Sequence, residues 1–176
     1  MRLIYVIAFL MALTISALAF EDTLTFDRCQ IINDPTDASQ PSKLVVHFQL
    51  PEAIAGREVI LAEITTRMGI TNVQQDSLLE LRFAPLLSQP FVGEVDYADI
   101  EAITDSMGVG AWTCRFDSAA YFRVDITEFV RAVSQGERDN FGLVGTLDLL
   151  GEANVILSEN LAGAIQNDAR VRVIYK

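Results

Sequence analysis

Short runs of alternating apolar and polar residues recur along most of the chain, which is the pattern of β-strands that bury one face. Residues 121–146 combine two such runs with a helical one. Phe129, Val130 and Val133 fall at helical spacing after the first run, Gly136 can end the helix, and Gly142–Leu147 resumes a strand. This order of strand, short helical crossover and strand predicts a β-sandwich organised around the stretch. In the first run, Phe122, Val124 and Ile126 alternate with Arg123 and Asp125.

The same alternation predicts strands on both sides of this stretch, separated by polar loops such as Asn33–Ser42. We expect Asp96–Met107 to be irregular or briefly helical, with Ile100 and Ile103 facing inward. Eight or nine short strands with turn signals between them predict an all-β fold, a single antiparallel jelly-roll-like β-sandwich with one short helical crossover. The other predicted strands cover Thr23–Ile32, Lys43–Leu50, Glu58–Arg67, Leu78–Phe83, Ala111–Phe116, Asn154–Ser158 and Arg170–Tyr175.

The N-terminal residues have the pattern of a secretory signal peptide. Arg2 supplies a short positive region, Leu3–Ile15 is apolar, and Ala17-Leu18-Ala19 is a small-x-small cleavage site. We therefore expect residues 1–19 to be removed from a secreted, periplasmic or extracellular protein, whose mature chain begins at Phe20. An uncleaved membrane anchor is the alternative, because the apolar run nearly spans a bilayer. After cleavage we expect no membrane span.

Neither a repeat nor a linker divides the remaining residues 20–176, so we expect one domain. Cleavage would change the net charge from -11 to about -12, because Arg2 is the only charged residue of the leader. Such a surface repels nucleic acid and anionic lipid, and we expect no nucleic-acid partner. The acidic residues are spread along the chain, which favours a solvated surface over a dedicated store of cations.

The sequence has two cysteines, Cys29 and Cys114, and both follow the predicted leader. Export permits oxidation, so we expect one disulfide bond that closes a long loop, worth ~4 kcal/mol in the chain-entropy model. Two buried free thiols are the alternative, because the sequence does not show that the two sulfurs meet. With a single histidine, the chain has too few ligands for a structural zinc site.

Acidic residues after the fourth predicted strand are the candidate metal ligands. Asp96, Asp99 and Glu101 offer oxygen ligands that suit a structural Ca²⁺, as does the loop Asn33–Asp37, although neither has EF-hand spacing. The same acids could serve glycoside hydrolysis, but that reaction needs a set separation across a cleft, which spacing does not report. His47 has no recognisable nucleophile, so we expect it to face solvent and expect no catalytic residues.

Aromatic residues are densest in the segment that ends at Phe122, which begins with Trp112 and also holds Phe116 and Tyr121. Flat aromatic rings can pack on the CH groups of a sugar, so Tyr97, Trp112 and Tyr121 are the candidate ligand-binding residues. Core packing explains these residues equally well. We expect Trp112 and Phe122 to be buried, which leaves Tyr97 and Tyr121 as the better exposed candidates.

Three pieces of the sequence resemble the DNRLRE domain, a secreted β-sandwich related to carbohydrate-binding modules. The first is a strand, a polar turn and a strand rich in Ala and Leu. The second is an aspartate-containing strand, a crossover and an Asn-aromatic-Gly-Leu strand, and the third is the closing strand. These pieces are Val45–Pro51 with Ile54–Ile64; Val124–Thr127 with Phe129, Val130, Gly136 and Asn140–Leu143; and Ala169–Tyr175.

The chain departs from the family pattern at the loop Asn33–Ser42 and at Val133, where the family usually has Trp. The resemblance implies a jelly-roll sandwich, usually non-catalytic, found in surface or polysaccharide-associated proteins. It transfers no binding residue to this chain.

These observations favour a secreted, non-catalytic module that binds carbohydrate or serves in adhesion at the cell envelope. Its partners would be polysaccharide or envelope proteins, and Asp125 and Thr127 would cap the helical crossover. The alternative is a structural or assembly subunit of an extracellular or envelope complex. A glycan hydrolase or lyase that uses the acidic stretch is less favoured.

Overall fold

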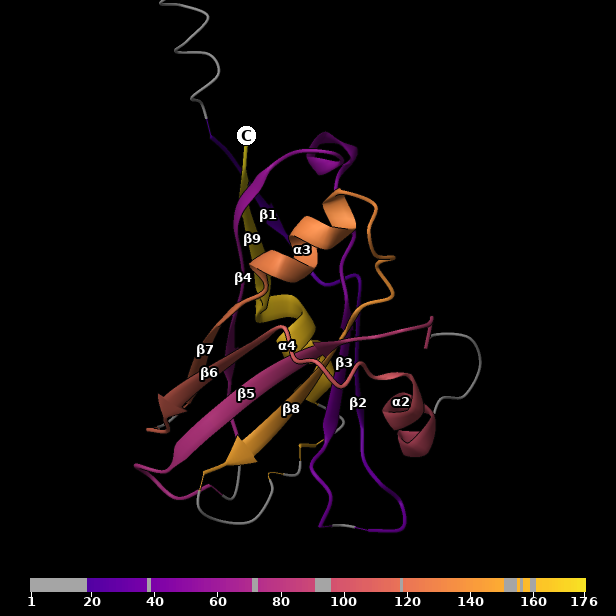
Figure 1. Cartoon of the computed structure of the whole chain (residues 1–176). Helices are drawn as coiled ribbons and strands as arrows, with labels where there is room; N and C mark the ends of the chain where they lie inside the picture. Colours follow the sequence, from indigo (N-terminus) through magenta and orange to yellow (C-terminus); the bar gives the residue numbers. More distant parts are fainter. Residues whose placement is uncertain are drawn as a thin grey trace, which may run out of the picture.

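The computed structural model describes residues 19–37, 39–70, 73–90, 96–117, 119–150, 155, 157–158 and 161–176 (Figure 1). These residues form nine strands in two antiparallel sheets and three short α-helices, so the predicted all-β sandwich is confirmed at this level. Residues 1–18 of the predicted signal peptide lie outside the described part. Among the described residues, no helix is both long enough and apolar enough to cross a bilayer.

The two sheets are built from strands that are mostly distant in sequence. The four-stranded sheet has the order β1 (Phe20–Leu24), β9 (Arg170–Tyr175), β4 (Val59–Met68) and β7 (Ala120–Asp125). The five-stranded sheet has the order β2 (Arg28–Ile32), β3 (Lys43–His47), β8 (Leu143–Leu149), β5 (Leu78–Pro85) and β6 (Gly110–Arg115).

The core lies between the sheets, and two-residue alternation fills it from both sides. In β7 the side chains of Phe122 and Val124 are buried, whereas Arg123 points outward. In β5 the apolar residues Leu79 and Leu81 are buried in the same core cluster. The predicted burial of Phe122 is therefore confirmed.

The stretch from β7 to β8 forms the predicted crossover, and it joins the two sheets. The helix α3 (Thr127–Ser134) begins two residues after β7, and Gly136 follows it in a left-handed conformation with φ of 72°. The Asp125 carboxylate accepts a hydrogen bond from the Thr127 N–H at 2.8 Å, but Ile126 is the N-cap residue and Thr127 does not cap the helix as expected. The Thr127 hydroxyl accepts one from the Ala62 N–H at 2.9 Å, which ties the helix to β4.

Several elements differ from the prediction. The expected strand Thr23–Ile32 is two strands in different sheets, because the chain crosses the sandwich where Phe26 enters the core. Part of the expected strand Asn154–Ser158 lies outside the described residues, and its described residues belong to no strand. The helix α4 (Leu161–Asp168) was not predicted; it follows that segment and buries Ile165. The remaining helical elements are the 3-10 helix η1 (Glu52–Ile54) and the helix α2 (Tyr97–Ile103).

The helix α2 falls in the predicted acidic stretch and covers part of the outer face of the five-stranded sheet (Figure 1). Its buried residues Tyr97 and Ile100 form a second apolar cluster with Val45 and Val144 of that sheet. Both faces of β3 are therefore buried in this region.

The two cysteines are free, so the predicted disulfide bond is wrong. Cys29 lies on β2 and Cys114 on β6, the two opposite edges of the five-stranded sheet. With strands ~4.8 Å apart, four spacings separate these edges by about 19 Å. A disulfide bond needs Cα atoms within about 7 Å of each other, so the sheet order itself keeps the sulfurs apart.

The Thr127→Val variant tests the link between α3 and β4. It keeps the side-chain shape but leaves the buried Ala62 N–H without its acceptor, which we expect to lower the free energy of unfolding by about 1–3 kcal/mol. The measurement is urea unfolding. Thr23→Val, at an exposed position on β1, is the matched control and should stay within ~0.5 kcal/mol of the parent. Equal losses in the two variants would contradict this role of the hydroxyl.

Alkylation of the cysteines tests whether Cys29 and Cys114 are free thiols, as the sheet order requires. Burial raises the pKa of Cys29 to about 11 and also raises the pKa of Cys114, so at pH 8 roughly one Cys29 thiol in a thousand is ionised. We expect iodoacetamide to alkylate the native mature chain slowly and to add two groups quickly in urea, without prior reduction, as read by mass spectrometry. A mature chain that accepts no label until it is reduced would rule out this arrangement.

Candidate functional site

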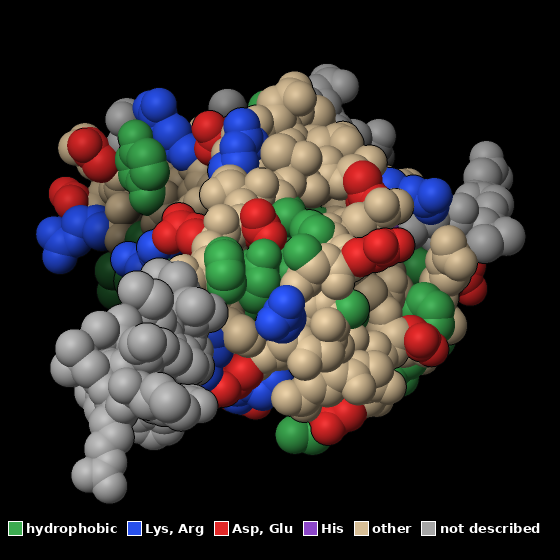
Figure 2. Space-filling view, turned by 90° about the horizontal axis from the view of Figure 1, so that it is seen from above, with side chains coloured by type: hydrophobic (Ala, Val, Ile, Leu, Met, Phe, Trp, Pro, Cys, Tyr) green, Lys and Arg blue, Asp and Glu red, His purple; other side chains and the backbone are tan. Residues whose placement is uncertain are grey.

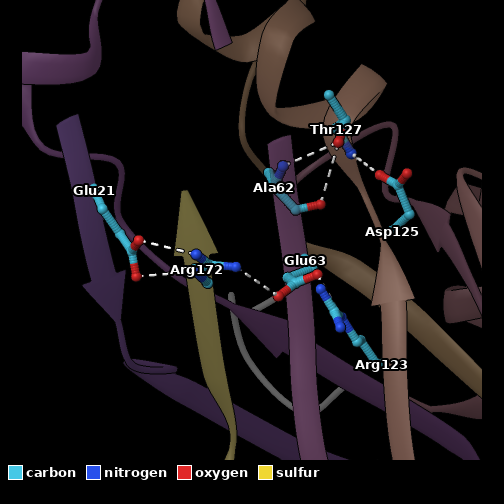
Figure 3. Close-up of polar contacts among 7 residues, drawn as sticks. All are labelled: Glu21, Ala62, Glu63, Arg123, Asp125, Thr127 and Arg172. Atoms are coloured by element: carbon cyan, nitrogen blue, oxygen red, sulfur yellow. Dashed lines mark hydrogen bonds and ion pairs between the residues drawn. The ribbon is translucent and has the colours of Figure 1, made fainter. Parts of the chain in front are cut away.

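The outer face of the four-stranded sheet carries a row of charged side chains that crosses all four strands (Figure 3). Glu21 lies on β1, Arg172 on β9, Glu63 on β4 and Arg123 on β7. Strand pairing places each of them on the face opposite the core, since their neighbours along each strand point inward. The row therefore joins strands from the beginning, middle and end of the sequence on one surface.

The charged side chains of the row are joined by ion pairs at hydrogen-bonding distance. Arg172 donates to both carboxylate oxygens of Glu21 at 2.9 Å and lies 3.5 Å from Glu63. The Arg123 Nε donates to Glu63 at 2.7 Å. Glu63 is only 5% exposed, so its carboxylate depends on these two guanidinium groups instead of on water. Bidentate pairing of this kind also fixes the geometry of the arginine side chain.

The hydrogen bonds from Arg172 lower the pKa of Glu21, and Glu21 raises the pKa of Arg172 in turn. A carboxyl group whose pKa is lower in the folded protein stabilises the fold above its unfolded pKa. This contribution is lost as the pH falls through the lowered pKa. The row is therefore intact at neutral pH and weakens in acid.

Tyr121 presents an aromatic ring beside this row. Its side chain on β7 is 61% exposed, which confirms that it is accessible. The neighbouring position on β4 is Arg67, whose guanidinium carbon lies 5.3 Å from the Tyr121 ring centroid. This is the distance of a cation–π contact. The contact keeps the ring and the guanidinium together at the surface.

A shallow depression of about 370 Å³ adjoins the ring. Its lining includes Thr65, Arg67 and Tyr121 from the sheet and Asp168 from the end of α4. The Asp168 carboxylate accepts a hydrogen bond from the Arg67 backbone N–H at 2.8 Å. The site thus combines one flat ring with a hydroxyl, a carboxylate and a guanidinium, which can stack on a ligand and form hydrogen bonds to it.

Trp112 lies at the seam where β6 meets β7. A Cβ atom at Gly110 would lie 1.9 Å from the Asp125 carbonyl oxygen, so the strands touch there. The two strands belong to different sheets and pack against each other at this seam. The expectation that Trp112 is buried is wrong, because β6 is an edge strand and leaves the ring 42% exposed.

The expectation that Tyr97 is exposed is also wrong. Tyr97 is the first residue of α2 and only 5% exposed, because its ring faces the sheet, and its hydroxyl donates to the Pro41 carbonyl at 3.0 Å. The Lys43 ammonium lies 5.2 Å from the ring centroid. Burial, with smaller effects from Glu101 and other acids, raises the Tyr97 pKa to about 12. Trp112 and Tyr121 therefore lie on strands that pack side by side, whereas Tyr97 packs against Val45 and Val144 on the outer face of the five-stranded sheet.

The predicted metal ligands have other partners in the structure. Asp96 caps α2 by accepting a hydrogen bond from the Asp99 N–H at 2.8 Å, and Glu101 lies 3.5 Å from the Lys43 ammonium. In the described part of the chain, no three His, Cys, Asp or Glu side chains come together as a metal-binding group. Calcium binding by Asp96, Asp99 and Glu101 stays a prediction.

The sequence did not indicate Thr65, Arg67 and Asp168 as site residues. Arg67 is separated from Tyr121 by 54 positions, and only the pairing of β4 with β7 brings the two together. Asp168 arrives through α4, which was not predicted. Alternation in β4 was the available signal, since it places Thr65 and Arg67 on one face, but it does not show which strand lies beside them.

Substitution of Glu63 tests the charged row. In Glu63→Gln the two arginines lose their shared carboxylate, and we expect the free energy of unfolding to fall by about 1–2 kcal/mol in urea denaturation. Glu128→Gln removes a carboxylate that is 77% exposed and pairs with Arg131, and it should change stability by less than ~0.5 kcal/mol. A neutral Glu63→Gln variant would show that the row contributes little to stability.

Comparison with known proteins identifies no relative. No model of a known protein family matches the chain, and no curated protein is detectably similar to it in sequence. The resemblance to the DNRLRE domain therefore stays a prediction from the sequence.

Proposed function

We propose that the protein is an exported, non-catalytic β-sandwich module that binds carbohydrate, in an adhesive or polysaccharide-associated role at the cell envelope. The observation that carries the proposal is the exposed Tyr121 ring, held by Arg67 at 5.3 Å beside the polar depression on the outer face of the four-stranded sheet. The ring would pack on the CH groups of a sugar. Thr65 and Asp168 would form hydrogen bonds to its hydroxyl groups.

Three finer features belong to the same proposal. Export through a signal peptide at residues 1–19 is supported by the pattern of the leader. A jelly-roll arrangement and kinship with the DNRLRE domain are supported by the three resembling pieces of sequence and are consistent with two packed antiparallel sheets. A structural Ca²⁺ is not required for stacking on Tyr121, so we expect binding to persist when calcium is chelated.

A structural or assembly subunit is the second candidate, and an apolar groove favours it. The groove measures about 380 Å³ beside α3, and its lining includes Met107, Val109, Phe129 and Ala132. Assembly surfaces usually present a large continuous apolar patch. Figure 2 shows the molecule from above, where hydrophobic side chains form small groups interspersed with charged ones. Carbohydrate binding is therefore the first proposal.

A glycan array probed with the mature chain 20–176, with calcium or with EDTA, tests the proposal. We expect binding to at least one polysaccharide class in both conditions. Tyr121→Ala should weaken that binding about tenfold, equivalent to ~1.4 kcal/mol, because it removes the stacking surface. Arg67→Gln should weaken it as well, since the guanidinium holds the ring and can donate to the sugar.

Two variants serve as controls for this experiment. Tyr97→Phe changes a buried tyrosine of α2, and Arg115→Gln changes an arginine on β6 that is 70% exposed. Both should bind the array as the parent does. Absence of binding to every glycan, or equal losses in the controls, would overturn the proposal. A large oligomer in solution that Met107→Ser dissociates would favour the assembly subunit instead.

A further inference from the structure

A second polar cavity lies at one end of the five-stranded sheet, on a different sheet from Tyr121. It has a volume of about 330 Å³ and is formed by four separate segments of the chain. These are the start of β2 with Asp27, the end of β3 with His47 and Gln49, the segment at Gln89, and the turn 139–141 before β8. We call this cavity the His47 pocket.

Hydrogen bonds hold the walls of the His47 pocket in place. The His47 Nδ1 lies 2.6 Å from an Asp27 carboxylate oxygen, and its Nε2 lies 3.2 Å from the Asn140 carbonyl oxygen. The Asn140 side-chain amide donates to the Phe48 carbonyl at 2.6 Å. His47 is therefore half-buried in the wall of a cavity, and the expectation that it faces solvent is wrong.

The turn before β8 approaches β3 more closely than most residues would allow. Gly142 has a φ of 104°, and a Cβ atom there would lie 2.4 Å from the Val46 carbonyl oxygen. Glycine is the residue that accepts both conditions. The close approach positions Asn140 and Phe141 against the end of β3, so the pocket is formed by the fold before any ligand arrives.

Side chains with unused hydrogen-bonding groups line the open part of the pocket. Gln49, Gln89 and Asp139 are exposed, and none of them forms a side-chain hydrogen bond to another residue that the structure describes. The oxygen of the Asn140 amide is buried and likewise has no partner among those residues. The half-buried ring of Phe141 supplies the apolar surface.

This lining matches the chemistry of a sugar. Hydroxyl groups donate to the carboxylate and to amide oxygens and accept from amide N–H groups, and the CH face of a sugar can pack on Phe141. Asp27 and Asp139 outnumber Arg28, the arginine in the lining, and disfavour an anionic ligand. The net charge of -11 on the whole chain acts in the same direction. The volume is near the lower end of ligand cavities, roughly 300–1,000 Å³, which suits one small molecule and not an extended chain.

We propose that the His47 pocket binds a single uncharged sugar residue, either a free monosaccharide or the end of a glycan. The ligand class follows the proposed function, but the site is separate from the Tyr121 face. The pocket therefore gives the module a second mode of recognition. The face offers an open ring for stacking, and the pocket encloses one residue.

The experiment is an NMR titration of the isotope-labelled mature chain with D-glucose, D-galactose, D-mannose and N-acetyl-D-glucosamine, with D-glucuronate as the charged comparison. We expect at least one neutral sugar to shift the backbone signals of His47, Asn140 and Phe141 and the side-chain amide signals of Gln49 and Gln89. Gln49→Ala and Gln89→Ala should each weaken that binding about fivefold, because each removes hydrogen bonds to the ligand.

Gln74→Ala is the matched control, since Gln74 is an exposed glutamine in a loop and does not line the pocket. It should leave binding unchanged. The inference is overturned if no neutral sugar shifts the pocket signals, if the glutamine variants bind as the parent does, or if glucuronate binds more tightly than every neutral sugar. Unchanged signals elsewhere in the variants show that they are folded.

The proposal for the Tyr121 face and the proposal for the His47 pocket can be overturned independently of each other. If the mature chain binds the glycan array, Tyr121→Ala weakens that binding and the NMR signals of the pocket do not move, the pocket inference fails. Carbohydrate binding by the Tyr121 face then stands. If monosaccharides shift the pocket signals while Tyr121→Ala changes nothing on the array, the pocket stands and the face is not the site.

Discussion

The two backbone polar groups of one buried residue, Ala62, decide where the chain leaves one sheet for the other. The Ala62 carbonyl accepts a hydrogen bond from the Ile126 N–H at 2.9 Å, and the Ala62 N–H donates to the Thr127 hydroxyl at 2.9 Å. Ala62 is fully buried, so water cannot replace either partner. Pairing between β4 and β7 therefore ends at Asp125, and α3 begins at a fixed place on the sandwich.

The hydrogen bonds of Ala62 also determine which side chains lie side by side on the outer face of the four-stranded sheet. Because β7 pairs with β4 in a fixed register, Tyr121 lies beside Arg67 and Arg123 can reach Glu63. A shift of β7 by one residue would turn the side chains of Tyr121 and Arg123 into the core. The buried carboxylate of Glu63 reinforces the same register, since it would lose Arg123 in any other.

The outer face around Tyr121 and the His47 pocket have the same kinds of side chains, although they belong to different sheets. Each places an aromatic ring beside planar polar side chains, and each is assembled from segments that are far apart in the sequence. Rigid strands support both, so little ordering would accompany binding. Such preformed sites favour affinity because fewer side chains have to be immobilised. The depression beside Tyr121 is the shallower of the two, whereas the His47 pocket is more enclosed.

The sequence by itself determined the layered β-architecture, because two-residue alternation requires each strand to bury one side. It placed the crossover of β7, α3 and β8 correctly, since alternation and helical spacing depend on neighbouring residues. It also identified Tyr121 as an exposed ring. Tertiary structure alone decided which strands are neighbours. That order separates Cys29 from Cys114, exposes Trp112 on an edge strand and buries Tyr97 of α2 against the five-stranded sheet. It also brings Arg67 to Tyr121 across 54 positions. Local patterns carry no information about such pairings, because they depend on how distant strands share one core.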